Sequence, residues 1–388
     1  MVAGHLQEKG DYYYIVLSYC DINNKRKTKW ISTGLKLKGN KKKAEALLLE
    51  TRKNFKPELI ALKDDMLFAD FLEQWLSVVK TRIEITTYAS YENQVKKIIA
   101  PYFRERQITL KNLKATDIQT FYMLQLNRVK PNSVIHYHAN IHAALKYAVK
   151  IDLIDFNPAD KVERPKKNSF SPSFYSDEEI ERLFEVSQGT LLEIPIFLGA
   201  FYGLRRSEVV GLKWSAIDFE KDTITINHII TTCSLGGKHV QVVKDTTKTK
   251  SSRRTLPLVK PFKERLVELY QKQEEYKELC GNSYNYEFEE YICVDPMGNL
   301  TQPNYISDAF PRLLEKNGLR HIRFHDLRHS CASLLLANGV PMKQIQEWLG
   351  HSDFSTTANI YAHLDYTSKL SSADALVNGL SDALSVYQ

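Results

Sequence analysis

Two hydrophobic patterns divide the amino-terminal part of the chain. Residues 11–35 place aromatic and β-branched residues on both sides of the polar run DINNKRK, which predicts a strand, a turn and a second strand. Residues 38–55 change to a helical period in which Ala, Leu and Glu dominate. We therefore expect residues 1–62 to form a small three-stranded sheet with one helix.

The pattern of residues 63–165 is helical. Within residues 66–80, five large apolar side chains share one helical face: Phe68, Phe71, Leu72, Trp75 and Leu76. Two more helices are expected to begin at the N-cap candidates Thr86 and Thr116, and a fourth near Pro131. This predicts a helical bundle, which ends in the proline- and lysine-rich residues 155–173.

Residues 166–388 predict a mainly α domain with a small antiparallel sheet. Ser176, followed three residues later by Glu179, forms a capping box at the start of its first helix. Residues 192–214 are expected to form one largely apolar helix. Strands are expected at residues 223–233, 238–245, 253–259 and 291–295. The whole chain is thus expected to be a multidomain α+β protein.

The positive charge of the chain is concentrated at its amino terminus. A chain of 388 residues with 43% hydrophobic and 26% charged residues is typical of a folded protein of two or three domains. Residues 1–60 contain 13 Lys or Arg against 6 Asp or Glu, whereas the remainder contains 40 of each. Basic residues 25–29 lie among the aromatic residues 12–14 and Trp30, which favours contact with nucleic acid.

Several protein classes are disfavoured. No apolar run reaches the roughly 18 residues that span a bilayer, and the first residues do not resemble a secretory signal. The 5 cysteines are widely spread without a CxxC pair, which disfavours a disulfide scaffold or a Cys-rich zinc site. We expect a cytoplasmic protein without membrane contact.

The segment GLRRSEVVGL contains the first candidate site residues. Arg205 and Arg206 follow a glycine in an apolar surrounding, and Glu208 lies three residues after Arg205. A buried arginine needs an anionic partner, because an unpaired buried charge is strongly unfavourable. That partner is either Glu208 or an anion from outside the protein.

The segment RFHDLRHS contains the second cluster. On a helix, His325 shares a face with Arg328 and with His329. The spacing resembles the zinc-binding HExxH motif. However, Asp326 would replace the longer Glu, and Arg328 would place a fixed cation beside the metal. An arginine next to a histidine suits a phosphate better, since guanidinium donors match phosphate oxygens.

The segment LGHSDFSTTANIYAHL contains a histidine, His351, and an isolated tyrosine, Tyr361. A tyrosine hydroxyl has a pKa near 10 and is a weak nucleophile unless nearby cations stabilise its anion. Arginines and histidines from the other two clusters could provide that stabilisation and neutralise a phosphodiester. A general acid must protonate the leaving oxygen, and the polar turn after residue 243 offers Lys244, Lys248 and Lys250.

These segments, in this order, resemble the tyrosine recombinase family, the phage-type integrases of phages and conjugative transposons. The resemblance implies that Tyr361 attacks the scissile phosphate of DNA and forms a 3′-phosphotyrosine. Arg205 and Arg328 would hold the non-bridging oxygens, His325 would assist proton transfer, and His351 would hydrogen-bond the phosphate. Lys248 would protonate the leaving oxygen, with Lys250 as the alternative.

The same resemblance implies the roles of the other parts. Residues 1–62 would bind arm-type DNA sites, residues 63–165 would bind core-type sites, and residues 166–388 would form the catalytic domain. Glu208 would support Arg205, whereas Arg206 and His329 would be structural or face DNA. A homotetramer on double-stranded DNA, an accessory DNA-bending or excision factor, and no metal or cofactor are expected. The apolar residues beyond residue 364 would pack on their own domain or dock on a neighbouring subunit.

Two other functions share part of this pattern. A type IB topoisomerase would use the same nucleophile but would need no second DNA-binding head. A non-catalytic DNA-binding regulator would have no use for Tyr361, so the complete residue set argues against it.

Overall fold

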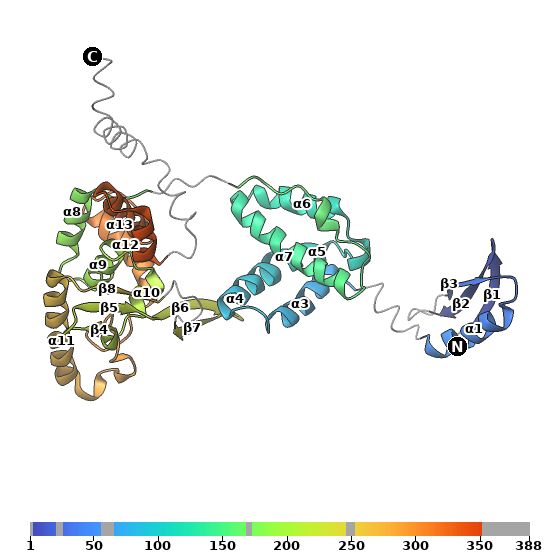
Figure 1. Cartoon of the computed structure of the whole chain (residues 1–388), viewed down its shortest axis with the longest axis horizontal. Helices are drawn as coiled ribbons and strands as arrows, with labels where there is room; N and C mark the ends of the chain where they lie inside the picture. Colours follow the sequence, from blue (N-terminus) through green and yellow to red (C-terminus); the bar gives the residue numbers. More distant parts are fainter. Residues whose placement is uncertain (1–2, 21–25, 56–65, 168–172, 246–252, 351–388) are drawn as a thin grey trace, which may run out of the picture. The chain divides into compact units, whose positions relative to one another are not determined.

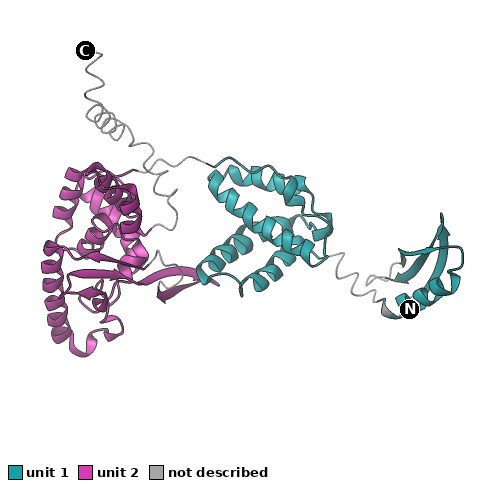
Figure 2. Ribbon diagram, viewed as in Figure 1, with its two compact units in different colours: residues 1–168 teal, residues 169–388 magenta. Residues whose placement is uncertain are grey.

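The computed structural model describes residues 3–20, 26–55, 66–167, 173–245 and 253–350. The chain forms two compact units, residues 1–168 and residues 169–388 (Figure 2).

The first unit begins with an antiparallel sheet in the order β1-β2-β3, followed by helix α1 (Figure 1). The bounds are β1 (Ala3–Lys9), β2 (Tyr12–Cys20), β3 (Arg26–Lys36) and α1 (Lys41–Asn54). Alternating residues of β2, among them Ile15 and Leu17, are fully buried. A side chain at Gly4, the partner of Leu17 on β1, would meet both Leu17 and Leu48 of α1, so this face of the sheet lies under the helix. The predicted sheet with one helix is confirmed.

After α1, the α-helices described in the first unit are α3 (Phe68–Val79), α4 (Ile85–Gln94), α5 (Ala100–Glu105), α6 (Ala115–Leu126) and α7 (Pro131–Lys150). The five apolar residues expected on one face of α3 are all buried. The predicted N-caps are wrong, because Thr86 and Thr116 lie inside the first turns of their helices. At α6 the start is stabilised instead by Asp117, whose carboxylate accepts the backbone N–H of Lys114 at 2.9 Å.

The proline- and lysine-rich residues 155–173, which were expected to end the bundle, begin with regular structure. Residues Pro158–Lys161 form a 3₁₀ turn that packs on α6 and α7. The side chain of Asn157 accepts the backbone N–H of Ala159 at 2.9 Å, which fixes this turn. Helix α7 ends earlier, at Lys150, and the chain after it stays on the bundle.

The second unit combines a small sheet, a hairpin and seven helices among the described residues. The helices are α8 (Asp177–Ser187), α9 (Glu193–Ala200), α10 (Arg206–Val210), α11 (Lys260–Cys280), α12 (Pro303–Lys316), α13 (Asp326–Ala337) and α14 (Met342–Leu349). The sheet has the order β4-β5-β8, with β4 (Ile217–Asp218), β5 (Thr223–Ile226) and β8 (Arg254–Pro257). Strands β6 (His228–Leu235) and β7 (Lys238–Asp245) form the hairpin. No described helix is both long and apolar enough to cross a membrane.

The capping box at α8 is confirmed. The Ser176 hydroxyl accepts the Glu179 backbone N–H at 3.3 Å, and the Glu179 carboxylate accepts the Ser176 backbone N–H at 2.9 Å. Both bonds satisfy donors that a helix start otherwise leaves unpaired.

Three predicted elements in this unit are wrong. The helix expected over residues 192–214 breaks between α9 and α10, where Gly203 has a φ of +65° that other residues rarely adopt. The strand expected over residues 223–233 is two strands, β5 and β6, which belong to different sheets. Residues 291–295 form only isolated bridges, to Lys213 and to Leu300.

Gly203 is also a position of close packing, which gives a testable expectation. A Cβ there would lie 2.3 Å from the side chain of Leu349, whereas a Cβ at Gly189, with φ +72°, would meet nothing within 4 Å. We expect Gly189→Ala to lower the free energy of unfolding by about 1–2 kcal/mol through backbone strain alone. Gly203→Ala should lower it by about 3 kcal/mol or more, because overpacking is added. Chemical denaturation of both variants measures the difference, and equal losses would contradict the clash.

Candidate active site

Arg205 stands at the start of α10 as its N-cap residue. Its guanidinium Nη1 donates to Glu208 Oε1 at 2.7 Å, and its backbone N–H donates to Glu208 Oε2 at 3.0 Å. The Glu208 side chain is 3% exposed and that of Arg205 is 36% exposed. The internal ion pair considered from the sequence is therefore present, and the arginine still reaches the surface.

A second arginine, Arg254, binds the same carboxylate and was missed by the sequence reasoning. Its Nη2 lies 3.0 Å from Glu208 Oε2 and its Nη1 lies 3.3 Å from Oε1. Burial raises the pKa of Glu208, but the adjacent Arg254 and Arg205 outweigh it and hold the pKa at about 2. Glu208 is therefore ionised at neutral pH. The sequence did offer one indication of this role. Arg254 and Leu256 are two residues apart, so on a strand they lie on the same face, which is the buried face of β8.

Arg328 projects from the first turns of α13 and is 2% exposed. Its Nη1 donates to the carbonyl of Gly203 at 2.5 Å, and its Nη2 donates to the carbonyl of Leu349 at 2.6 Å. Burial, reinforced by the nearby Arg205, lowers the pKa of Arg328 to about 9. The group stays cationic at neutral pH, and its position is set by the αL turn at Gly203.

His325 and His329 lie at the start of α13, with ring centroids 5.4 Å apart. Desolvation, together with the nearby His329 and Arg328, lowers the pKa of His325 to about 4, although the residue reaches the surface. The imidazole is therefore neutral at pH 7 and can accept a proton. Asp326 is held by Arg323, whose Nη2 lies 2.6 Å from its carboxylate. The described part of the chain contains no group of three or more His, Cys, Asp or Glu side chains placed to hold a metal.

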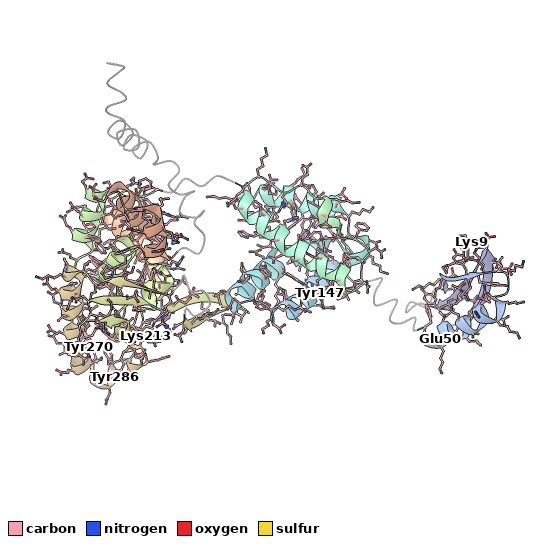
Figure 3. The ribbon with its side chains drawn as sticks, viewed as in Figure 1. Lys9, Glu50, Tyr147, Lys213, Tyr270 and Tyr286 are labelled. Carbon is pink, nitrogen blue, oxygen red and sulfur yellow. The ribbon has the colours of Figure 1, made fainter. Side chains whose placement is uncertain are left out.

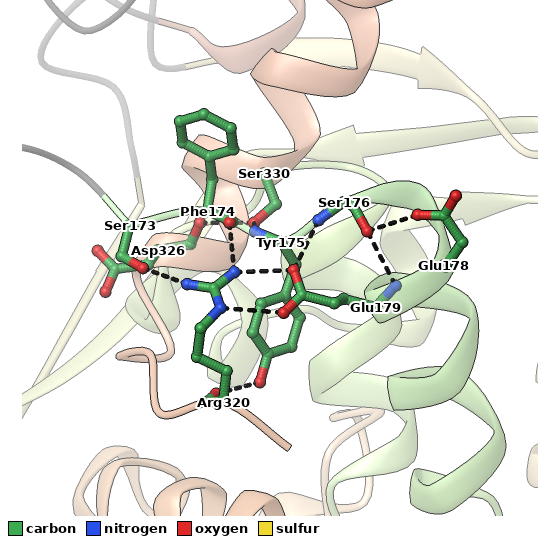
Figure 4. A network of polar contacts seen from close by, with 9 residues as sticks. All are labelled: Ser173, Phe174, Tyr175, Ser176, Glu178, Glu179, Arg320, Asp326 and Ser330. Atoms are coloured by element: carbon green, nitrogen blue, oxygen red, sulfur yellow. Dashed lines mark hydrogen bonds and ion pairs between the residues drawn. The ribbon is translucent and has the colours of Figure 1, made fainter.

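A polar network anchors α13 to the segment that leads into α8 (Figure 4). The Ser330 hydroxyl accepts the backbone N–H of Tyr175 at 2.9 Å and donates to the carbonyl of Asp326 at 3.1 Å. Arg320 donates to both carboxylate oxygens of Glu179, at 3.0 and 2.8 Å, and to the carbonyl of Phe174 at 2.7 Å. These contacts fix the helix that presents His325 and Arg328.

A pocket of about 470 Å³ opens beside these residues. Its basic lining residues are Arg205, Arg206, His321, Arg323 and His325. Arg206 also donates to the hydroxyl of Ser307. The structure thus brings Arg205 and His325 to one cationic pocket. It places Arg328 next to them, because Arg328 and Arg205 bind the neighbouring carbonyls of Leu349 and Gly350.

The other predicted site residues lie outside the described residues. These are Lys248 and its alternative Lys250, His351, Tyr361, and the apolar segment beyond residue 364. His351 directly follows Gly350, whose carbonyl accepts a hydrogen bond from Arg205 Nη2 at 3.2 Å. The described site therefore ends where the segment with the predicted nucleophile begins.

Comparison with known proteins identifies the family of this chain. A model described as the phage integrase family matches residues 174–368, half of the chain. A second, described as the phage integrase N-terminal SAM-like domain, matches residues 67–126. The chain belongs to the phage integrase family and is a tyrosine recombinase, an enzyme that cleaves and rejoins DNA.

Two similar recombinases match this chain over most of their length. A tyrosine recombinase XerC-like protein of Caldanaerobacter subterraneus subsp. tengcongensis is 28% identical over 352 residues, covering 87% of this chain and 89% of the relative. The ICEBs1 integrase of Bacillus subtilis is 26% identical over 337 residues, covering 86% and 89%. The predicted class, a site-specific recombinase of a mobile element, is confirmed.

Solved structures share the fold. The Tn1549 transposon integrase in complex with a circular intermediate DNA has a TM-score of 0.66 at 17% identity, covering 80% of this chain and 99% of that chain. A lambda integrase tetramer bound to a Holliday junction has a TM-score of 0.55 at 17% identity, covering 90% and 92%. These likenesses confirm the predicted multidomain α+β class.

Proposed function

We propose that this recombinase cuts and rejoins double-stranded DNA through a 3′-phosphotyrosine formed by Tyr361. The observation that carries the proposal is the convergence of Arg205 and Arg328, from separate helices, on adjacent carbonyls beside His325 and a cationic pocket. Arg205 and Arg254 bind the carboxylate of Glu208, and Arg328 lies near enough for that carboxylate to raise its pKa. One carboxylate offsets only one of these three positive charges, so the cluster of four groups keeps a net positive charge that suits a phosphodiester anion.

The chemistry follows from these charges. The Tyr361 oxygen attacks phosphorus as its proton passes to the neutral imidazole of His325. The bond from phosphorus to the 5′ oxygen breaks, and Lys248, or Lys250, protonates that oxygen as it leaves. Arg205 and Arg328 stabilise the negative charge that builds on the non-bridging oxygens, and His351 donates to the same phosphate. The 5′-hydroxyl of another strand reverses the step without ATP, because the phosphotyrosine retains the energy of the broken bond.

The amino-terminal sheet supports a second DNA-binding role. On the face opposite α1, Trp30 is 51% exposed and its ring lies 6.3 Å from that of Tyr14. Lys9, which Figure 3 labels, lies at the end of β1. Its ammonium lies 5.8 Å from the Trp30 ring and 6.0 Å from the Tyr14 ring. A cationic and aromatic sheet face suits a DNA groove. A separate DNA-binding head of this kind favours a recombinase that bridges sites over a type IB topoisomerase.

The three parts of the chain have separate roles in the proposed assembly. We assign arm-type sites to residues 1–62, core-type sites to residues 63–165 and catalysis to residues 166–388. The proposal also includes assembly as a homotetramer on DNA, assisted by an accessory DNA-bending or excision factor. This assembly takes place in the cytoplasm, where the DNA lies. The fold shared with a lambda integrase tetramer supports the tetramer.

The direct test uses the full chain and the DNA that flanks its own gene. Incubation followed by SDS denaturation should leave a protein–DNA band that protease removes and that contains phosphotyrosine after acid hydrolysis. Absence of this band with DNA that the protein binds would reject the proposed chemistry.

Arg206 gives a test of DNA contact at the pocket. We expect Arg206→Gln to weaken binding to core DNA similarly for all sequences and to make the slope of log K against log salt shallower by about one, because one phosphate contact is lost. Titrations at several salt concentrations measure the slope. Arg312→Gln, on α12, is the matched control and should leave the slope unchanged. An unchanged slope for Arg206→Gln would assign this residue to structure alone.

Removal of residues 1–60 tests the amino-terminal charge. The truncated protein should lose affinity for distal arm-type sites and show a shallower salt dependence there, whereas cleavage of the core site survives. Filter binding with arm-site and core-site DNA separates the two effects. Unchanged salt dependence on arm-site DNA would contradict the charge argument.

A further inference from the structure

The carboxyl end of α14 is held by three arginines. The last carbonyls of a helix have no partner within the helix, and cations are favoured there. The carbonyl of Trp348 accepts from Arg254 Nε at 2.8 Å, that of Leu349 from Arg328 Nη2 at 2.6 Å, and that of Gly350 from Arg205 Nη2 at 3.2 Å. We call these three residues, Trp348, Leu349 and Gly350, the α14 terminus. The chain enters His351 directly after it.

Arg254 is almost completely enclosed by protein groups. It is 8% exposed, and all three of its guanidinium nitrogens donate to protein acceptors, namely Trp348 and the two oxygens of Glu208. A planar guanidinium fits a carboxylate with two parallel bonds. Its position therefore suits holding other groups in place, not contacting the phosphate.

The shared carboxylate explains what Arg254 does for Arg205. Because the fork of Arg254 occupies both oxygens of Glu208, the Arg205 side chain is held by one oxygen only, through Nη1, and its Nη2 points to the α14 terminus. Without Arg254, Glu208 could bind Arg205 with both oxygens. The guanidinium that should meet the phosphate would then be drawn into an internal ion pair.

We propose that Arg254 is a positioning residue of strand cleavage, which keeps Arg205 available to the scissile phosphate and fixes the α14 terminus at the entry to His351. This inference rests on the proposed function of the site. It joins three separate elements at one point, because β8 carries Arg254, α10 carries Glu208, and α14 carries Trp348. Arg254 acts through Arg205 and is not itself a catalytic residue.

The test compares Arg254→Lys with the wild-type full chain in single-turnover cleavage of the core site that the adduct assay identifies. Lysine keeps the charge but cannot bind both Glu208 oxygens and the Trp348 carbonyl at once. We expect cleavage to slow by about 10- to 100-fold, the effect known for residues that orient a metal ligand, with DNA affinity close to wild type. The matched control is Arg253→Lys, at the exposed neighbouring arginine, and should cleave normally.

Modified DNA separates positioning of Arg205 from a general structural defect. A methylphosphonate at the scissile position removes the phosphate charge, so the ratio of wild-type to Arg254→Lys rates should shrink toward one. A 5′-bridging phosphorothiolate needs no proton on its leaving sulfur, and the ratio should stay as on normal DNA. The same ratio on all three substrates, or shrinkage on the phosphorothiolate alone, would overturn the inference.

Two further measurements keep the test decisive. If thermal unfolding shows that Arg254→Lys is unfolded at the assay temperature, Arg254→Gln takes its place. Its side chain can still hydrogen-bond one Glu208 oxygen but leaves the carboxylate available to Arg205, so it should give the same substrate pattern. Wild-type protein that forms no adduct would reject the proposed function itself. Wild-type adduct with full activity of Arg254→Lys would reject only the role of Arg254.

Discussion

Tyr361→Phe should bind core-site DNA like the wild type and form no SDS-resistant adduct with it. The substitution removes one oxygen, which in the proposed mechanism is the atom that attacks phosphorus, and keeps the aromatic ring. Recombination between two sites should be abolished together with the adduct. Gel-shift titration and denaturing electrophoresis of the same samples measure both properties.

The chain offers a matched control for this variant. Tyr366 lies five residues further on in the same carboxyl-terminal segment. Tyr366→Phe should keep both DNA binding and the adduct. If Tyr366→Phe lost the adduct and Tyr361→Phe kept it, the nucleophile would be misassigned. Full biological function of Tyr361→Phe would instead indicate a DNA-binding regulator.

The sequence predicted correctly those elements that depend only on residues near one another in the chain. The apolar face of α3 and the capping box of Ser176 depend on residues three or four positions apart, which a helix brings together. The break at Gly203 was missed because the surrounding residues are apolar and helix-compatible. Its cause lies elsewhere in the chain, where Leu349 packs against the glycine and Arg328 binds its carbonyl.

In the candidate site, too, some residues could be predicted from local sequence and others depend on distant parts of the chain. The segments around Arg205 and Arg328 could be found because phosphate chemistry restricts which residue types serve it, and those types stand close together in the sequence. Arg254 could not be found in this way. Its partners, Glu208 and Trp348, are 46 and 94 residues away, so its role depends on how the sheet and helices pack.

Arg328 allows a test of whether the arginine geometry, and not charge alone, drives cleavage. Arg312→Lys, at an exposed site on α12, serves as the matched control and should have normal activity. Thermal unfolding of both variants shows whether the loss of buried hydrogen bonds has unfolded the protein at the assay temperature. Only a folded Arg328→Lys variant is compared with the wild type.

Folded Arg328→Lys should cleave the core site about 100- to 1000-fold more slowly than the wild type, the usual effect of losing one donor to a developing negative charge. Lysine keeps the positive charge, but one ammonium cannot span the carbonyls of Gly203 and Leu349, which the guanidinium holds at 2.5 and 2.6 Å, and also meet a phosphate oxygen. Because the charge is retained, DNA affinity should change little. Single-turnover cleavage measures the rate. A normal rate in the folded variant would mean that the phosphate does not bind between Arg205 and Arg328, and the proposed mechanism would fail with it.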